Sequence, residues 1–457
     1  MKIIVFCAFL ATLSWGATEP KIIVEHDSSL LNTTLQVIVT AGAADDLLDR
    51  AGLSNLASEL MLRGTKKRTR ARFQSEVERM GALIQATASH ELMVFTGSVI
   101  LENTDRFLAL VEDFLVHPAL DAKELEPLRV EILGEISNQK NNNTRLTGIA
   151  MRKELFAGTP LERPVMGCLS SVKAIKRDDV LRKYNNHVHR GNVFFAVSTA
   201  LPEEQIRKTL SAMWLKLPDG LKTSRRVVVP KIPVAPTITL IHKAQTQAGA
   251  FMLGQAGLTI ADPDRYVLQV GNFSFGGEPL VSRLFRIVRG ELGYTYSIGS
   301  TYGLTGSLSN QKGIYAVHST PSIEFTTKAL LKVMDLWNSY QKEGLTAPEM
   351  KLATQSIVNS YPFEFDSANK RLGQRIKEYL YNDPILSPEA FGQKIYSIEP
   401  ETLKKSVQNH HTPRGFMITL LADETIIKKQ FETEQAVIPA DQRLTISKVI
   451  TPEQLIE

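Results

Sequence analysis

Residues 52–65 read Gly52-Leu53-Ser54-Asn55-Leu56-Ala57-Ser58-Glu59-Leu60-Met61-Leu62-Arg63-Gly64-Thr65, and they are the most informative part of the chain. On a helix, Asn55 and Glu59 are four residues apart and lie on one face. Two imidazoles in these places would hold one metal ion, and a Glu in place of Ser58 could deprotonate a metal-bound water. Zinc prefers nitrogen and sulfur donors, whereas Asn55 offers a neutral amide oxygen. The stretch has the spacing of a zinc-binding helix without the residues that would hold zinc.

This spacing resembles the motif of the M16 (pitrilysin, or inverted-zincin) metallopeptidases, G-x-x-H-x-x-E-H followed by a short apolar run and G-T. On that motif Asn55 replaces the first His, Ser58 the general-base Glu and Glu59 the second His. The family's third ligand, a Glu on a later helix, corresponds to Glu135, which lies 76 residues after Glu59 in a run similar to the family's V-x-L-x-E-I. The resemblance implies a degenerate zinc site at these four positions, no metal in this chain, and zinc in a partner subunit.

The stretch from Gly81 to Thr87 is similar to a strand of the same family that begins G-x-x-x-N-A. In active relatives this edge strand pairs with the backbone of the substrate. Such pairing needs an exposed strand edge more than a particular side chain. The resemblance therefore implies peptide contacts at Gln85, which replaces the usual Asn, and Ala86. The alternative interpretation is an ordinary sheet strand without a role in binding.

The second half contains a run that resembles the Gly-rich loop and following helix of the family, L-G-G-x-x-S-R-L-F-x-x-L-R. The resemblance implies peptide contacts at Gly276 and Gly277, and places Arg289 and Tyr296 where active relatives have an Arg and a Tyr that reach the substrate. Amide hydrolysis builds negative charge on the carbonyl oxygen, and losing one donor aimed at it costs about 100- to 1000-fold in rate. The alternative is structural, with Arg289 in an ion pair and Tyr296 in the core.

The chain reads as two similar halves. The predicted boundaries are a signal peptide at 1–17, an N-terminal M16-like domain at 21–226, a linker at 227–236 and a C-terminal M16-like domain at 237–457. Strand-like runs open the halves at 34–40 and 237–241 and close them at 192–198 and 415–421, with helices predicted at 107–116 and 327–340. Capping boxes are predicted at Asp121 and Thr346. Repetition of this order favours duplicated α+β domains. The resemblance implies two homologous α/β sandwiches of the LuxS/MPP-like metallohydrolase type, forming half of a clamshell.

Composition excludes several classes of protein. The 457 residues are 43% hydrophobic and 22% charged, with a net charge of +5 and no basic stripe of the kind that binds nucleic acid. Lys2 and the apolar run that follows are typical of a signal peptide, so we expect export, to the periplasm if the source is bacterial. No other run reaches the length of a membrane span. Removal of the signal takes Cys7 away and leaves Cys168 without a disulfide partner.

The predicted function is that of a non-catalytic, peptide-binding subunit, similar to the zinc-less subunits of mitochondrial processing peptidase and of bacterial periplasmic M16 heterodimers. A zinc-bearing M16 subunit would be the partner, and peptide or unfolded polypeptide the substrate. One alternative is an assembly scaffold without a peptidase role. Another is an enzyme with an altered metal site at Asn55, Glu59 and Glu135, which suits a hard cation better than zinc. The nine histidines show no replacement site, since no acidic residue stands at a telling spacing from them.

Overall fold

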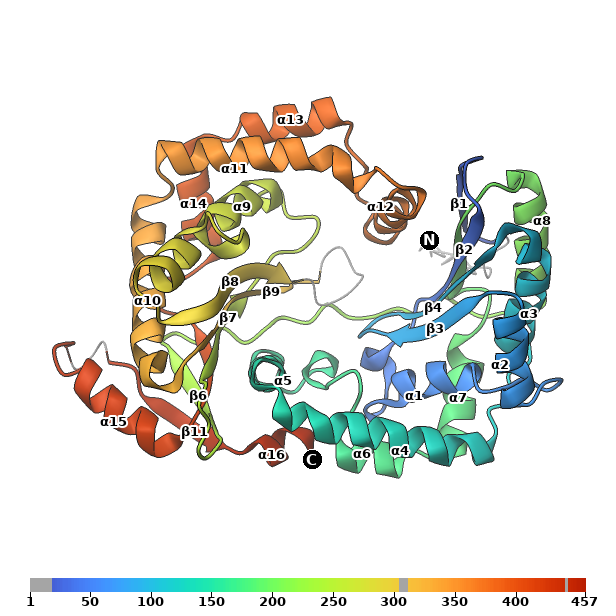
Figure 1. The fold of residues 1–457 in the computed structure, drawn as a ribbon, viewed down its shortest axis with the longest axis horizontal. Helices are drawn as coiled ribbons and strands as arrows, with labels where there is room; N and C mark the ends of the chain where they lie inside the picture. The colour runs from blue at the N-terminus through green and yellow to red at the C-terminus, as the bar shows by residue number, and fades with distance from the viewer. Residues whose placement is uncertain (1–18, 304–310, 440–442) are drawn as a thin grey trace, which may run out of the picture.

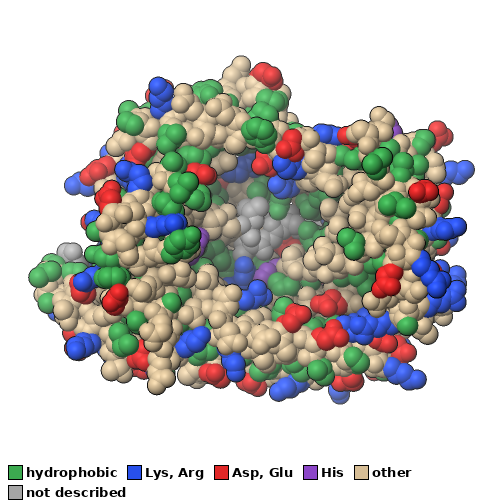
Figure 2. Space-filling model, in the orientation of Figure 1, with side chains coloured by type: hydrophobic (Ala, Val, Ile, Leu, Met, Phe, Trp, Pro, Cys, Tyr) green, Lys and Arg blue, Asp and Glu red, His purple; other side chains and the backbone are tan. Residues whose placement is uncertain are grey.

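The structure is a computed structural model that describes residues 19–303, 311–439 and 443–457 (Figure 1). The predicted signal peptide lies outside the described residues. Two mixed β-sheets backed by helices stand opposite each other (Figure 1). In the space-filling view the same face is hollowed between the two halves, and Lys, Arg and His side chains gather around the hollow (Figure 2).

The first sheet has the order β1-β5-β2-β4-β3 and is parallel only between β1 and β5. Its strands are β1 (Ile22–His26), β2 (Asn32–Val39), β3 (Leu83–Ala88), β4 (Met93–Ile100) and β5 (Val193–Thr199). Apolar side chains alternate along β4, and their buried face packs on the helices. These helices are α1 (Leu53–Met61), α2 (Arg70–Arg79), α3 (Thr104–Val116), α4 (Ala122–Asn138), α6 (Leu169–Ala174), α7 (Arg177–His187) and α8 (Glu203–Leu215).

The second sheet repeats this order as β6-β10-β7-β9-β8, with β11 added outside β6. Its strands are β6 (Thr237–His242), β7 (Ala250–Ala256), β8 (Thr295–Gly303), β9 (Ile314–Pro321), β10 (Met417–Ala422) and β11 (Ile446–Ile450). The helices that pack in this half are α9 (Arg265–Asn272), α10 (Thr326–Glu343), α11 (Ala347–Ser360), α13 (Pro388–Tyr396), α14 (Pro400–His410) and α15 (Glu424–Glu434). The repeated order confirms the predicted duplication, and the predicted strands and helices lie within a few residues of the observed ones.

Each half also sends a helix to the sheet of the other. Helix α5 (Asn143–Leu155) packs on β7 and β10 of the second sheet, where the Thr419 hydroxyl donates to the carbonyl of Thr147 over 2.9 Å. Helix α12 (Ala368–Tyr381) packs on β1 and β5, with Leu372 buried against Phe194 and Ala196. Both helices lie between the halves in Figure 1. The terminal helix α16 (Pro452–Ile456) joins the core of the first half. Residues 227–236 contain no helix or strand, and the boundaries on either side of them remain predictions.

One of the two predicted capping boxes is only half formed. Thr346 and Glu349 cap each other's backbone N–H groups at the start of α11, as predicted. Asp121 caps α4 by accepting from the N–H of Lys123, but Glu124 turns away and accepts from Arg70. Glu124 bonds to Arg70 and not to the backbone because a guanidinium offers the carboxylate a charge-assisted hydrogen bond. Within the described part of the chain, no helix combines the length and apolarity needed to cross a bilayer.

Candidate functional site

Helix α1 places three of the predicted site residues. It begins after Gly52, whose φ of +94° lies in the left-handed region and whose Cβ would be 2.5 Å from the carbonyl oxygen of Met166. Only glycine meets both demands. Asn55 and Glu59 share a face as predicted, and the Asn55 amide donates to Glu59 Oε1 over 2.9 Å. Ser58 is buried, and its hydroxyl donates to the carbonyl of Asn55 over 2.8 Å. The Ser58 hydroxyl is therefore engaged within the helix and is not accessible from solvent.

Glu135 extends the site from α4, which packs against α1. Burial raises the pKa of the Glu59 carboxyl, and the negative charge of Glu135 raises it further. The two carboxylates are therefore electrostatic neighbours, as the resemblance implies. Arg63 opposes this effect but is ion-paired with Glu131.

The donor set at this site does not fit zinc. Among the described residues, the only group of three His, Cys, Asp or Glu side chains arranged to hold a metal lies elsewhere in the molecule. Besides Glu59 and Glu135, the site offers only the Asn55 amide, which already donates a hydrogen bond to Glu59. Zinc prefers nitrogen or sulfur donors, and a catalytic zinc usually has three protein ligands. These residues therefore do not support a zinc-dependent reaction.

Strand β3 is an edge strand, as the resemblance implies. It pairs with β4 alone, and within the described residues no strand pairs with its other edge. Gln85 is exposed and Ala86 half-buried, and Leu83 is 74% exposed. Helix α1 packs against β3, so the degenerate site lies beside the open edge. The open edge has the geometry that backbone pairing requires, and peptide contact at β3 stays a prediction beside the alternative of an ordinary sheet strand.

The two glycines of the Gly-rich loop have different environments. They end a π-helical turn, Phe273–Gly277, that follows α9. Gly276 is buried, and a Cβ there would lie 2.5 Å from Cδ1 of Leu284 and 2.6 Å from Oγ of Ser300. Gly277 is exposed, although its Cβ would be 2.5 Å from Nδ2 of Asn272. Packing accounts for Gly276, so Gly277 is the one that a peptide could reach directly.

Arg289 and Tyr296 contact each other at the start of β8. The guanidinium lies 4.1 Å from the centre of the Tyr296 ring and 4.4 Å from that of Phe285. In the described residues no carboxylate lies within ion-pair distance of Arg289, and Tyr296 is 79% exposed. Tyr296 falls in a register irregularity of β8 between Thr295 and Ile298, and such bulges re-aim side chains. The structural alternative is therefore wrong, since Arg289 has no such ion pair and Tyr296 is not in the core.

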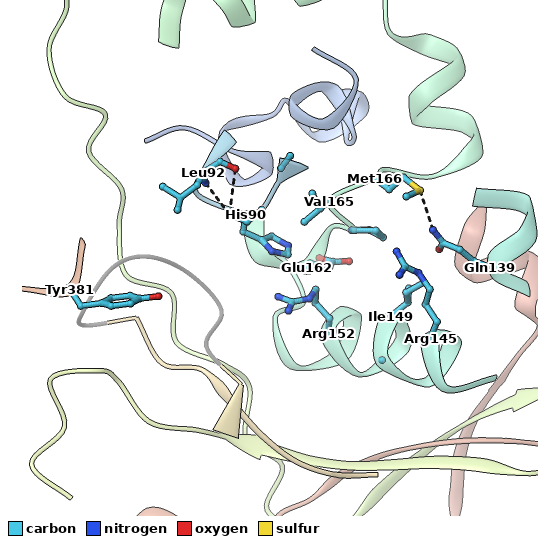
Figure 3. A pocket seen from close by; sticks show the side chains of 14 residues that line it. His90, Leu92, Gln139, Arg145, Ile149, Arg152, Glu162, Val165, Met166 and Tyr381 are labelled. Carbon is cyan, nitrogen blue, oxygen red and sulfur yellow. Dashed lines mark hydrogen bonds between the residues drawn. The ribbon is translucent and has the colours of Figure 1, made fainter. Parts of the chain in front are cut away.

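Sequence reasoning missed a cavity of about 710 Å³ beside the degenerate site (Figure 3). Its walls come from the loop after β3, the end of α4, one face of α5, the segment after α5 and the end of α12. The lining residues with side chains that can bond or carry charge include His90, Gln139, Arg145, Arg152, Glu162 and Tyr381. The available signal was the spacing 145, 148, 149 and 152, which places four lining residues on one helical face.

The acidic neighbours of His410 were also not apparent from the sequence. The fold brings this histidine, at the end of α14, to Asp264 over 3.1 Å and Asp262 over 3.6 Å. Asp262, Asp264 and His410 form the group of three side chains arranged to hold a metal, with ligand atoms within 4.8 Å of one another. The partners are more than 140 residues away in the chain, beyond the reach of any local pattern. The hydrogen bond between His410 and Asp264 accounts for this cluster without a metal.

Fold and site together define a class of protein. The α/β domain is duplicated. Its first copy carries a helix with metallopeptidase spacing, α1, a second carboxylate on α4 and an open strand edge beside them. Family models agree with this class. One described as "Insulinase (Peptidase family M16)" matches residues 21–168, and one described as "Peptidase M16 inactive domain" matches residues 174–357. The chain belongs to peptidase family M16.

Relatives of the chain are named both as zinc proteases and as a non-peptidase homologue. The chain is 22% identical over 371 residues to a protein named "Uncharacterized zinc protease" of Rickettsia bellii, covering 80% of this chain and 87% of that one. It is 19% identical over 362 residues to "Non-peptidase homolog YmxG" of Helicobacter pylori, covering 79% and 82%. The solved peptidase M16 inactive domain of Pseudomonas fluorescens has the same fold, with a TM-score of 0.80, 21% identity and coverage of 89% and 97%.

Proposed function

We propose that this protein is a non-catalytic, peptide-binding subunit of a heterodimeric M16 zinc peptidase, exported and periplasmic if its source is bacterial. The zinc-bearing subunit would supply the metal and the general base. This chain would supply the open edge of β3, the loop at Gly277, and Arg289 with Tyr296 to complete the partner's active site.

One observation carries the proposal: Tyr296 is exposed and holds a half-buried Arg289 that has no ion pair among the described residues, while the zinc donors of the family motif are replaced. A phenol and a guanidinium are suited to a developing oxyanion. The pair has no zinc site to act on within this chain, because Asn55 and Glu59 do not provide the donors that zinc requires. A site shared between subunits gives the surviving pair a role.

The test is reconstitution with a zinc-bearing M16 subunit and a peptide substrate. We expect Arg289→Ala with Tyr296→Phe to lower kcat by about 100-fold or more while leaving association of the subunits intact. The control is Arg286→Ala with Tyr396→Phe, because both residues are exposed and Arg286 lies on the same helical segment. Unchanged kcat in the first double variant contradicts completion of the active site in trans.

The scaffold alternative is favoured by the name of the Helicobacter relative, a non-peptidase homologue. It predicts stable complex formation that is indifferent to both double variants. The altered-metal alternative rests on the adjacent carboxylates of Glu59 and Glu135. It predicts that the purified chain binds a divalent cation and cleaves peptides alone, which metal analysis and a peptidase assay without partner decide.

A further inference from the structure

The cavity beside β3 has a basic lining that the degenerate zinc site does not explain. Arg145 and Arg152 stand seven residues apart on α5 and line it from the same helical face. His90 lines the opposite side, and in Figure 3 the Arg152 and His90 side chains lie on either side of Glu162. Glu162 is the only acidic residue among the described lining residues, and it accepts a hydrogen bond from the Gly158 N–H over 2.6 Å.

Arg152 is a half-buried cation without an anionic partner. Among the described residues no carboxylate lies within ion-pair distance of its guanidinium, which makes only a long contact of 3.5 Å to the carbonyl of Leu161. It also lies 5.8 Å from the ring centre of Phe156. Burial lowers the pKa of Arg152 to about 10, and no nearby anion offsets that effect. A guanidinium in this state gains from an anion that enters the cavity.

The cavity lies where a bound peptide would arrive. Ala88, the last residue of β3, lines it, so an extended chain paired with the open edge of β3 runs towards it. Gln139 and Met166 line it from the side of the degenerate site. Gln139 lies one helical turn after Glu135, and Met166 contacts the start of α1 at Gly52. The cavity therefore adjoins both the end of the open strand and the helices that carry the degenerate site.

We propose that this cavity is a carboxylate subsite, in which Arg152, assisted by Arg145, binds a carboxylate of a peptide held on β3. The proposal rests on the proposed function, because it takes the ligand to be a peptide. The carboxylate comes from an acidic side chain or from the C-terminus of the peptide. A C-terminal carboxylate reaches the cavity only when the peptide runs parallel to β3, whereas an acidic side chain reaches it in either direction.

The experiment measures binding of fluorescently labelled extended peptides to the full chain, alone and with a zinc-bearing subunit. The peptides form a matched set: one Glu with a free C-terminus, the same with Gln, and each with a C-terminal amide. We expect loss of the recognised carboxylate to weaken binding about tenfold or more, as for a hydrogen bond to a charged group. A loss on substitution of Glu by Gln identifies the side chain as the source of the carboxylate, and a loss on amidation identifies the C-terminus.

Variants then assign the loss to the cavity. Arg152→Met should weaken the acidic peptide about tenfold and leave the neutral one unchanged, and Arg152→Lys should retain part of the preference. Lys153→Met is the matched control, an exposed cation next in sequence that does not line the cavity. If Arg152→Met fails to fold, Arg145→Met makes the same test from an exposed position. Equal binding of all four peptides overturns the carboxylate subsite alone, and binding of none overturns peptide binding with it.

Discussion

Glu59 occupies a ligand position of the family motif, in a helix that has Asn55 and Ser58 at the other two positions. Its carboxylate is half-buried, beside a second carboxylate and an amide donor. A bound cation would favour the ionised form, whereas burial and Glu135 favour the protonated form. In the absence of a cation, the ionised carboxylate of Glu59 therefore destabilises the fold.

Replacement of Glu59 by Gln should stabilise the protein at neutral pH. The folded-state pKa is raised, so as pH rises above the ordinary pKa of Glu the unfolded chain loses its proton first and stability falls. Glu59→Gln removes this cost and keeps an oxygen for the Asn55 amide. We expect the unfolding midpoint to rise at pH 7 and to match wild type near pH 4.

The matched control is Glu131→Gln on the neighbouring helix α4. Hydrogen bonding to Arg63 lowers the pKa of Glu131, so its carboxylate stabilises the fold above the ordinary pKa of Glu. The variant should lose stability at pH 7 or leave it unchanged. A lower midpoint for Glu59→Gln at pH 7 would show that its carboxylate is stabilising and would favour a bound cation at the site.

At the scale of elements, the Gly-rich loop depends on packing as much as on any ligand. The π-helical turn presses the backbone of Gly276 against Leu284 and Ser300, which leaves no room for a side chain. The loop that carries Gly277 is held in place by this contact. A role in peptide binding for one glycine thus rests on a structural role for its neighbour.

Gly276→Ala should destabilise the protein by about 1–3 kcal/mol, because the added methyl overpacks a closed contact. Gly373→Ala provides the comparison, since this glycine lies inside α12 with open space where its Cβ would be. There we expect a gain of about 0.5–1 kcal/mol from helix propensity and reduced chain entropy. Denaturant unfolding measures both, and equal effects of the two substitutions would argue against the packing explanation.

At the scale of the whole molecule, the two halves are interlocked. Helix α5 of the first half covers the second sheet, α12 of the second half covers the first, and the N–H of Ser170 donates to the last residue, Glu457, over 3.2 Å. The hollow between the halves therefore has walls made by both. Tyr381 from α12 lines the same cavity as Arg152 from α5.

A chain cut in the linker should remain one particle. Val234 is 99% exposed, so a protease site inserted between Val234 and Ala235 is accessible. We expect the fragments to co-elute in size-exclusion chromatography and to separate only in denaturant, because each retains a helix buried on the other's sheet. Spontaneous separation would show that the halves are independent and that α5 and α12 contribute little to their association.

Much of this architecture was predictable from local patterns. The i, i+4 spacing of Asn55 and Glu59 and the strand character of β3 are properties of adjacent residues, and helix or strand periodicity turns them directly into geometry. The duplication followed from the order of such segments. The capping partner of Glu124 was predicted wrongly, because Arg70 approaches it from another helix.

Contacts between segments far apart in the chain depended on the tertiary fold. The placement of α5 on the second sheet and of α12 on the first arises from packing across long sequence separations. So does the meeting of His410 with Asp262 and Asp264. The unpaired state of Arg152 belongs with them, because it depends on which carboxylates the folded chain places nearby. Periodicity acts over a few residues, whereas burial and charge pairing are set by the surfaces that the completed core brings together.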